Sequence, residues 1–105
     1  GEIWTVNLNP GYKSEPGKTR PALVIQNNAI DCGSYIVIPI SSVEKEGIKN
    51  LQHKIKARDN LKKDSVLILP AVRSVDAARF KEGPLTKLEN DEMDEVLKKL
   101  TKIIS

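Results

Sequence analysis

The chain has 105 residues, of which 39% are hydrophobic and 30% charged, and these ordinary fractions exclude a disordered or fibrous protein. This length suffices for one domain with a buried core and is too short for two, so we predict a single domain over residues 1–105. The net charge of +3 is modest. No apolar run approaches the roughly 18 to 20 residues that span a bilayer, so we expect no membrane segment. The single cysteine, Cys32, excludes an internal disulfide, and we therefore expect a cytoplasmic protein.

The first predicted element is a strand at residues 2–8, where the side chains alternate as a half-buried strand requires. Ile3 falls on one face, and the other face carries Trp4, Val6 and Leu8. Residues 9–19 follow with several Pro, Gly and Ser residues, which favour irregular backbone. We therefore predict a loop over this stretch.

Two short apolar runs, residues 21–25 and 35–40, are rich in the branched side chains that suit pleated sheets. Both are predicted to be core strands. The polar connection at residues 27–34 contains turn residues, so we expect the two strands to be antiparallel neighbours.

Residues 51–56 alternate weakly and predict an edge strand within a basic stretch, residues 49–63. The cationic side chains of this stretch, against Asp59 alone, are Lys49, Lys54, Lys56, Arg58, Lys62 and Lys63. Such a stretch could contact phosphates, although a lysine-rich segment is more often only a solvated surface.

A further buried strand is predicted at residues 65–70, and residues 71–75 continue it. Pro70 lies between the two parts and cannot donate a backbone hydrogen bond. We therefore expect a bend or bulge there, and a curved sheet.

The one predicted helix lies near the C-terminus, where apolar residues recur at helical spacing from Met93 to Ile104. Acidic residues at its start, with Glu89 or Asn90 as the cap, and lysines at its end suit the helix dipole. Several short strands followed by one helix predict a mainly β, α+β fold: a small, strongly bent antiparallel sheet, or SH3-like open barrel, closed by a C-terminal helix.

Several short motifs occur in a fixed order along the chain. They are GEIW at residues 1–4, NP at 9–10 with SE at 14–15, GKTRPALVIQN at 17–27, VIPISS at 37–42, KDSV at 63–66 and VRSVD at 72–76. In order and spacing, and together with the closing helix, these motifs resemble the MazF/PemK family of toxins, and only residues 43–62 match weakly.

The resemblance implies a CcdB/PemK-like toxin fold, a homodimer, and a type II antitoxin partner whose acidic, flexible C-terminal segment covers the RNA groove. It also implies an endoribonuclease that cuts single-stranded mRNA at a short sequence, leaving a 2′,3′-cyclic phosphate and a 5′-hydroxyl. No cofactor is implied. The residue types also argue against a metal site. The acidic side chains lie mostly on the predicted helix, and the chain has one histidine and one cysteine, so we expect no metal to bind.

Metal-free RNA cleavage needs a base for the 2′-hydroxyl, an acid for the leaving 5′-oxygen, and positive charge on the phosphate oxygens. Arg20 matches the family's chief catalytic arginine, and its pKa above about 12 suits charge stabilisation or proton donation better than base catalysis. Glu15, in the preceding loop, is the more natural base, unless it is a solvated or ion-paired carboxylate. Ser41 stands where the family usually has threonine and could donate to the phosphate, whereas the plainer alternative is that Ser41 and Ser42 begin a turn.

A second group of side chains is predicted to bind RNA. They are Tyr12, Lys13, Lys18, Thr19, Ser42, His53, Lys54 and Lys56. The lysines would neutralise phosphates, and Tyr12 would stack on a base. A lone histidine such as His53 is more often a packed or surface residue than a catalyst, and Arg73 is expected to brace strands through carbonyl or carboxylate groups.

Two alternatives compete with the nuclease. One is a non-catalytic binding module of the same fold, for example a toxin that poisons a topoisomerase, and the other is a small RNA-binding barrel of the OB or SH3-like type. Retention of Glu15, Arg20 and Ser41 argues against the first, and the long family match argues against the second.

Overall fold

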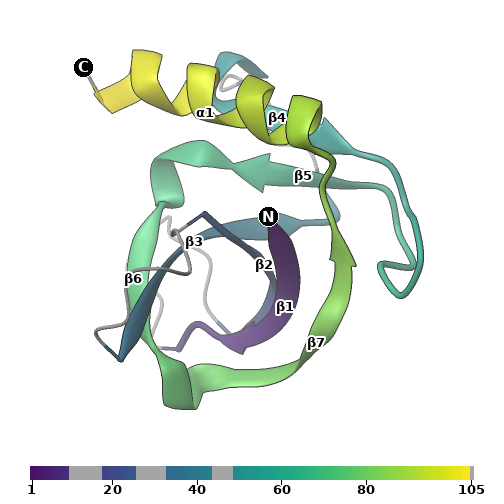
Figure 1. Ribbon diagram of the computed structural model, residues 1–105, viewed down its shortest axis with the longest axis vertical. Coiled ribbons are helices and arrows are strands. Elements are labelled where there is room, and N and C mark those ends of the chain that lie inside the picture. Colours follow the sequence, from purple (N-terminus) through teal and green to yellow (C-terminus); the bar gives the residue numbers. More distant parts are fainter. Residues whose placement is uncertain (10–17, 26–32, 44–48, 105) are drawn as a thin grey trace.

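The computed structural model describes residues 1–9, 18–25, 33–43 and 49–104, and Figure 1 shows a curled sheet with one helix. The strands are β1 (Glu2–Asn7), β2 (Thr19–Val24), β3 (Ser34–Ser41), β4 (Gln52–Ile55), β5 (Ser65–Ile68), β6 (Arg73–Asp76) and β7 (Phe80–Lys87). Short 3-10 turns lie at η1 (Lys49–Leu51), η2 (Leu69–Ala71) and η3 (Ala77–Arg79), and the helix is α1 (Asn90–Ile104). The predicted α+β class is confirmed.

The strands form one antiparallel sheet in the order β4-β5-β3-β2-β1-β7, with β6 paired to β3 beside this path. The long strand β3 therefore has two partners on one side: Tyr35 lies opposite Val75 of β6, and Ile40 lies opposite Leu67 of β5. The chain turns between β5 and β6 at η2, which contains Pro70, so the predicted bend is confirmed. The edge position predicted for β4 is also confirmed.

The central strands bury apolar side chains on both faces. One cluster also includes helix residues and contains Ile3, Leu23, Ile38, Val96 and Leu100. The second contains Val6, Leu8, Ala22, Val24, Val37 and Val75, bordered by Trp4, Tyr35 and Phe80. Ile3 and Val6 thus belong to different clusters, as the alternation in the first strand predicted.

Strand β7 was not predicted from the sequence, because most of its side chains are exposed and show no apolar alternation. Its only strand neighbour is β1, and this pairing is interrupted by register shifts on either side of Thr5. Gly83 within β7 has φ +156°, and a Cβ there would lie 2.7 Å from the indole of Trp4. Only glycine therefore allows β7 to pass this close to Trp4.

The start of α1 is held by a side-chain cap from Glu92 and by the first backbone hydrogen bond of the helix. The backbone N–H of Glu89 donates to Glu92 Oε1 (3.0 Å), and the Met93 N–H donates to the Glu89 carbonyl (3.0 Å), so Glu89 takes the cap position. Glu92 also accepts a 2.6 Å hydrogen bond from Arg58 Nη1, which ties the helix start to the segment after β4. Among the described residues, no helix is long and apolar enough to cross a membrane.

Candidate active site

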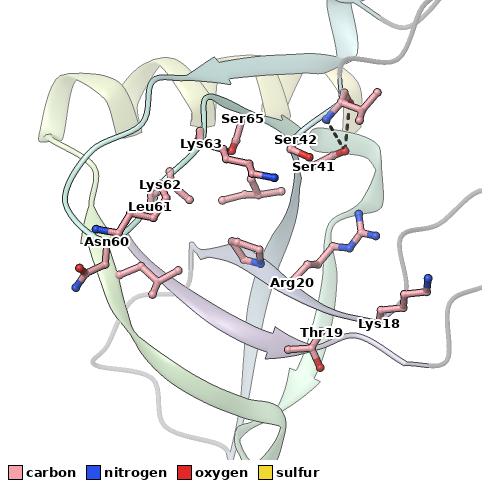
Figure 2. A pocket seen from close by; sticks show the side chains of 14 residues that line it. Lys18, Thr19, Arg20, Ser41, Ser42, Asn60, Leu61, Lys62, Lys63 and Ser65 are labelled. Atoms are coloured by element: carbon pink, nitrogen blue, oxygen red, sulfur yellow. Dashed lines mark hydrogen bonds between the residues drawn. The ribbon is translucent and has the colours of Figure 1, made fainter.

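A pocket of about 550 Å³ opens where the beginning of β2, the end of β3 and the segment before β5 come together (Figure 2). Its cationic lining residues are Lys18, Arg20, Lys62 and Lys63. Its hydroxyl-bearing lining residues are Thr19, Ser41, Ser42 and Ser65. No carboxylate belongs to the part of the lining that the structure describes. Four cations with hydroxyl donors and no described carboxylate make a site suited to an anion.

Arg20 reaches this pocket from β2, where it lies opposite Val6 of β1. The strand is anchored by Ala22, Leu23 and Val24, which are buried on the two faces of the sheet. Arg20 itself is half-buried, and Figure 2 shows its side chain extending into the pocket. A rigid strand therefore aims the predicted catalytic arginine, as the sequence suggested.

Ser41 lines the same pocket from the end of β3, the neighbour of β2. Its Oγ accepts from the Val43 N–H and donates to the Val43 carbonyl, both at 3.1 Å, so it closes a turn as the plainer alternative proposed. Ser42 is exposed, and its hydroxyl has no hydrogen-bond partner within the described ranges. Both hydroxyls lie in the pocket, and Ser41 would have to redirect its proton from Val43 to reach a phosphate.

The loop that carries the other predicted residues is closed at its base. The Leu8 N–H donates to the Lys18 carbonyl (2.8 Å), and the Lys18 N–H donates to Asn9 Oδ1 (2.6 Å). Lys18 adopts φ +65° there and lines the pocket. The predicted residues inside the loop, Tyr12, Lys13 and Glu15, lie outside the described residues.

A smaller pocket of about 340 Å³ adjoins the first and shares Ser42 and Ser65 with it. Lys54 and Lys56, both predicted to bind RNA, line this second pocket from the β4 side. Asp64 also lines it, and its Oδ1 accepts from the Ala57 N–H (2.8 Å). Cationic side chains therefore line both of these adjoining pockets.

His53 lines neither pocket. Its Nδ1 lies 3.1 Å from Lys99 Nζ of α1, so it packs between β4 and the helix. Burial lowers the pKa of His53, and the nearby Lys99 charge lowers it further. The structure thus favours the packed role over the predicted RNA contact.

Arg73 has the bracing role expected from the sequence. Its Nη1 donates to the Leu8 carbonyl (3.1 Å), which joins β6 to the end of β1. Arg79 adds donors to the Asn7 carbonyl (3.3 Å) and the Asn9 carbonyl. These arginines stabilise the base of the loop whose other end carries Lys18.

Comparison with known proteins decides the family. Residues 1–104 match the sequence profile of a family described as the PemK-like, MazF-like toxin of type II toxin-antitoxin systems. This chain belongs to that family. A relative from Staphylococcus saprophyticus, named endoribonuclease MazF, is 34% identical over 99 residues, which cover 91% of this chain and 82% of the relative.

Solved structures share the fold of this MazF/PemK-family toxin. MazF from Deinococcus radiodurans superposes with a TM-score of 0.82 at 24% identity, covering 99% of this chain and 93% of that one. The MazE-MazF structure from the same organism gives a TM-score of 0.74 at 22% identity, covering 99% and 92%. At identities this low, the comparisons show only that the fold is shared. The superpositions support the predicted CcdB/PemK-like architecture.

Part of the pocket of this toxin was not selected from the sequence. Asn60 and Ser65 line it without having been predicted, and Lys62 and Lys63 were expected only as members of the basic stretch that could contact phosphates. The signal was present, since Lys62 and Lys63 end the basic stretch and Lys63 begins the KDSV motif. Among the described residues, no group of three His, Cys, Asp or Glu side chains gathers as metal ligands would.

Proposed function

We propose that this toxin is an endoribonuclease that cuts single-stranded mRNA at a short sequence without a metal ion, leaving a 2′,3′-cyclic phosphate and a 5′-hydroxyl. The observation that carries the proposal is the meeting of Arg20 and the hydroxyls of Ser41 and Ser42 in one cationic pocket. Such a pocket provides what the reaction demands most, which is stabilisation of the charge that develops on the phosphate oxygens. The family membership and the name of the Staphylococcus saprophyticus relative support it.

In this proposal, the guanidinium of Arg20 holds non-bridging phosphate oxygens, for which its planar fork is suited. Ser41 donates a hydrogen bond to the same phosphate. Glu15 takes the proton of the attacking 2′-hydroxyl, and its loop rejoins the described chain at Lys18, which lines the pocket. An acid then protonates the leaving 5′-oxygen, and Arg20 is the first candidate.

The RNA strand is proposed to run from the Arg20 pocket across Ser42 into the smaller pocket. Lys54 and Lys56 would neutralise flanking phosphates there, with Lys18 and Thr19 acting at the opposite end. Tyr12 and Lys13 would contact bases from the loop, since single-stranded RNA is commonly recognised by stacking and edge contacts.

We also propose that the toxin is a homodimer acting in the cytoplasm, and that a cognate antitoxin neutralises it. An acidic, flexible antitoxin segment would compete with RNA for the same cations. The structures of related toxins with antitoxins support a partner of this kind.

The test uses single-stranded RNA in EDTA with the unmodified protein and Arg20→Ala. We expect cleavage by the unmodified protein and at least about 10³-fold slower cleavage by Arg20→Ala, with unchanged thermal unfolding, because removing one transition-state donor typically costs about 10²–10³-fold and Arg20 supplies two. A substrate with one 2′-deoxy nucleotide at the mapped cleavage site should be inert, since it lacks the nucleophile. Binding without cleavage would favour the non-catalytic module, and full activity of Arg20→Ala would refute the mechanism.

A further inference from the structure

The segment between β4 and β5, residues 56–64, is a well-anchored part of the pocket wall, and we name it the Lys63 loop. Arg58 and Leu61 pair across its turn through backbone hydrogen bonds of 2.9 and 2.8 Å. The Asn60 N–H donates to the Leu85 carbonyl of β7 (3.1 Å), and Leu61 is 4% exposed in the core. The turn is therefore anchored both to β7 and to the core.

The second half of the Lys63 loop is held equally well. Ser65 Oγ donates to the Lys63 carbonyl (2.8 Å), and Asp64 Oδ1 accepts from the Ala57 N–H (2.8 Å). Ser65 is 8% exposed and begins β5, so the backbone of Lys63 is clamped between the sheet and the turn. A side chain carried by such a backbone projects in a defined direction.

The two lysines at this point have different surroundings. Lys62 Nζ donates to the Asp59 carbonyl of its own loop (3.3 Å). The ammonium of Lys63 has no hydrogen-bond or ion-pair partner among the residues that the structure describes. Figure 2 shows the Lys63 side chain extending into the pocket on the side of Ser41 and Ser42, from the wall that faces β2 and Arg20.

We propose that Lys63 binds the scissile phosphate from the wall opposite Arg20, so that two cations on separate elements share the charge of the transition state. This inference rests on the function proposed above. In the step concerned, the bond from the 2′-oxygen to phosphorus forms and the bond to the 5′-oxygen breaks. The base of the site takes the 2′-hydroxyl proton, its acid protonates the 5′-oxygen, and Lys63 keeps its protons and stabilises the non-bridging oxygens.

The lining of the pocket favours an anion beside Lys63. Arg20 and Lys63 are both cationic residues of this pocket, and its described lining contains no carboxylate. A phosphate that touches both side chains gains two charge-assisted contacts. Lys54 and Lys56 lie in the adjoining pocket, where flanking phosphates would bind, and Lys62 is bonded within its own loop, so Lys63 is the lysine of this wall placed for the reacting phosphate.

The test compares Lys63→Gln with Lys98→Gln, a control that removes the same charge from an exposed lysine of α1 that lines neither pocket. With a short RNA that carries a mapped cleavage site, we expect Lys63→Gln to lower kcat by about 10²-fold with little change in KM, because the contact strengthens in the transition state. Lys98→Gln should change kcat by less than about 3-fold, as expected for an exposed charge outside both pockets. Lys63→Arg, which keeps a cation, should recover at least about a tenth of the lost rate.

Three results would overturn the inference. The first is a Lys63→Gln protein that cuts RNA as fast as Lys98→Gln, with both variants unfolding at the same temperature. The second is a loss confined to KM and accompanied by a weaker salt dependence, which would assign Lys63 to a flanking phosphate. The third is failure of the unmodified protein to cut any RNA, which would refute the nuclease itself, whereas the first two leave the nuclease intact.

Discussion

Replacing Gly83 by alanine is expected to destabilise the protein strongly, because two costs fall on one position. A side chain rarely adopts the φ of +156° found there, and the added Cβ would lie 2.7 Å from Trp4 Cδ2 and 2.9 Å from Trp4 Cε3. Backbone strain of this kind costs about 1–3 kcal/mol, and overpacking of a filled site costs about 1–3 kcal/mol. Their sum, about 2–6 kcal/mol, corresponds to a fall in Tm of roughly 10–30 °C for a domain of this size.

Two contacts hold the indole in its present position. Trp4 meets Phe80 edge-on with ring centroids 5.8 Å apart, and its Nε1 donates to Glu2 Oε1 (3.1 Å). Relieving the collision would therefore disturb the ring contact with Phe80 of β7 and the hydrogen bond to Glu2 within β1. The overlap between the added Cβ and the indole of Trp4 should therefore lower the free energy of unfolding.

The matched control is Gly33→Ala. Gly33 also has a positive φ, +81°, but nothing lies within 4 Å of the Cβ that would be added. Gly33→Ala should therefore lower the free energy of unfolding only by the cost of backbone strain, about 1–2 kcal/mol. Urea unfolding followed by the fluorescence of Trp4, the single tryptophan, and by circular dichroism measures both variants. If Gly83→Ala proved no less stable than Gly33→Ala, the close approach of β7 to Trp4 would be refuted.

Two further predictions concern the site and the helix start. Ser41→Ala should lower the single-turnover cleavage rate by about 10-fold, less than Arg20→Ala, because one neutral hydrogen bond is lost; a larger loss in Ser42→Ala would instead identify Ser42 as the working hydroxyl. The hydrogen bond from Arg58 lowers the pKa of Glu92 in the folded protein. The Arg58–Glu92 interaction therefore stabilises the fold fully above the pKa of Glu92 in the unfolded chain, about 4.3, and this stabilisation is lost as the pH falls through the lower pKa of the folded protein. Glu92→Gln should therefore cost about 0.5–1 kcal/mol in urea unfolding at pH 7 and almost nothing at pH 2, and an equal cost at both pH values would contradict this account.

Local pattern was sufficient for the elements that bury a regular apolar face. The alternation of Ile3 against Val6 predicted β1, and the helical spacing through Val96 and Leu100 predicted α1. Pro70 predicted a bend at this point of the chain, because proline lacks the backbone N–H that a continuous strand would use, and the structure has the η2 turn there. In each case the sequence pattern that predicts the element is contained within a few neighbouring residues.

The site was only partly predictable for the same reason. Arg20 and Ser41 were found through motifs that each lie on a single strand. For His53 the sequence left both an RNA contact and a packed role open, because no local feature shows that it lies beside Lys99 of α1. The role of Arg73 could be expected, since an arginine between buried valines needs carbonyl acceptors, and Leu8 supplies one.

What the sequence alone determined is therefore the set of strands with an apolar face, the closing helix and the residues of the longest motifs. The tertiary structure alone decided that β7 pairs with β1, since Gly83 and its exposed neighbours carry no apolar period and depend on a backbone partner distant in sequence. It likewise decided that Lys63 shares a pocket with Arg20, because anchoring of the Lys63 loop to the Leu85 carbonyl is a long-range contact that no local periodicity encodes.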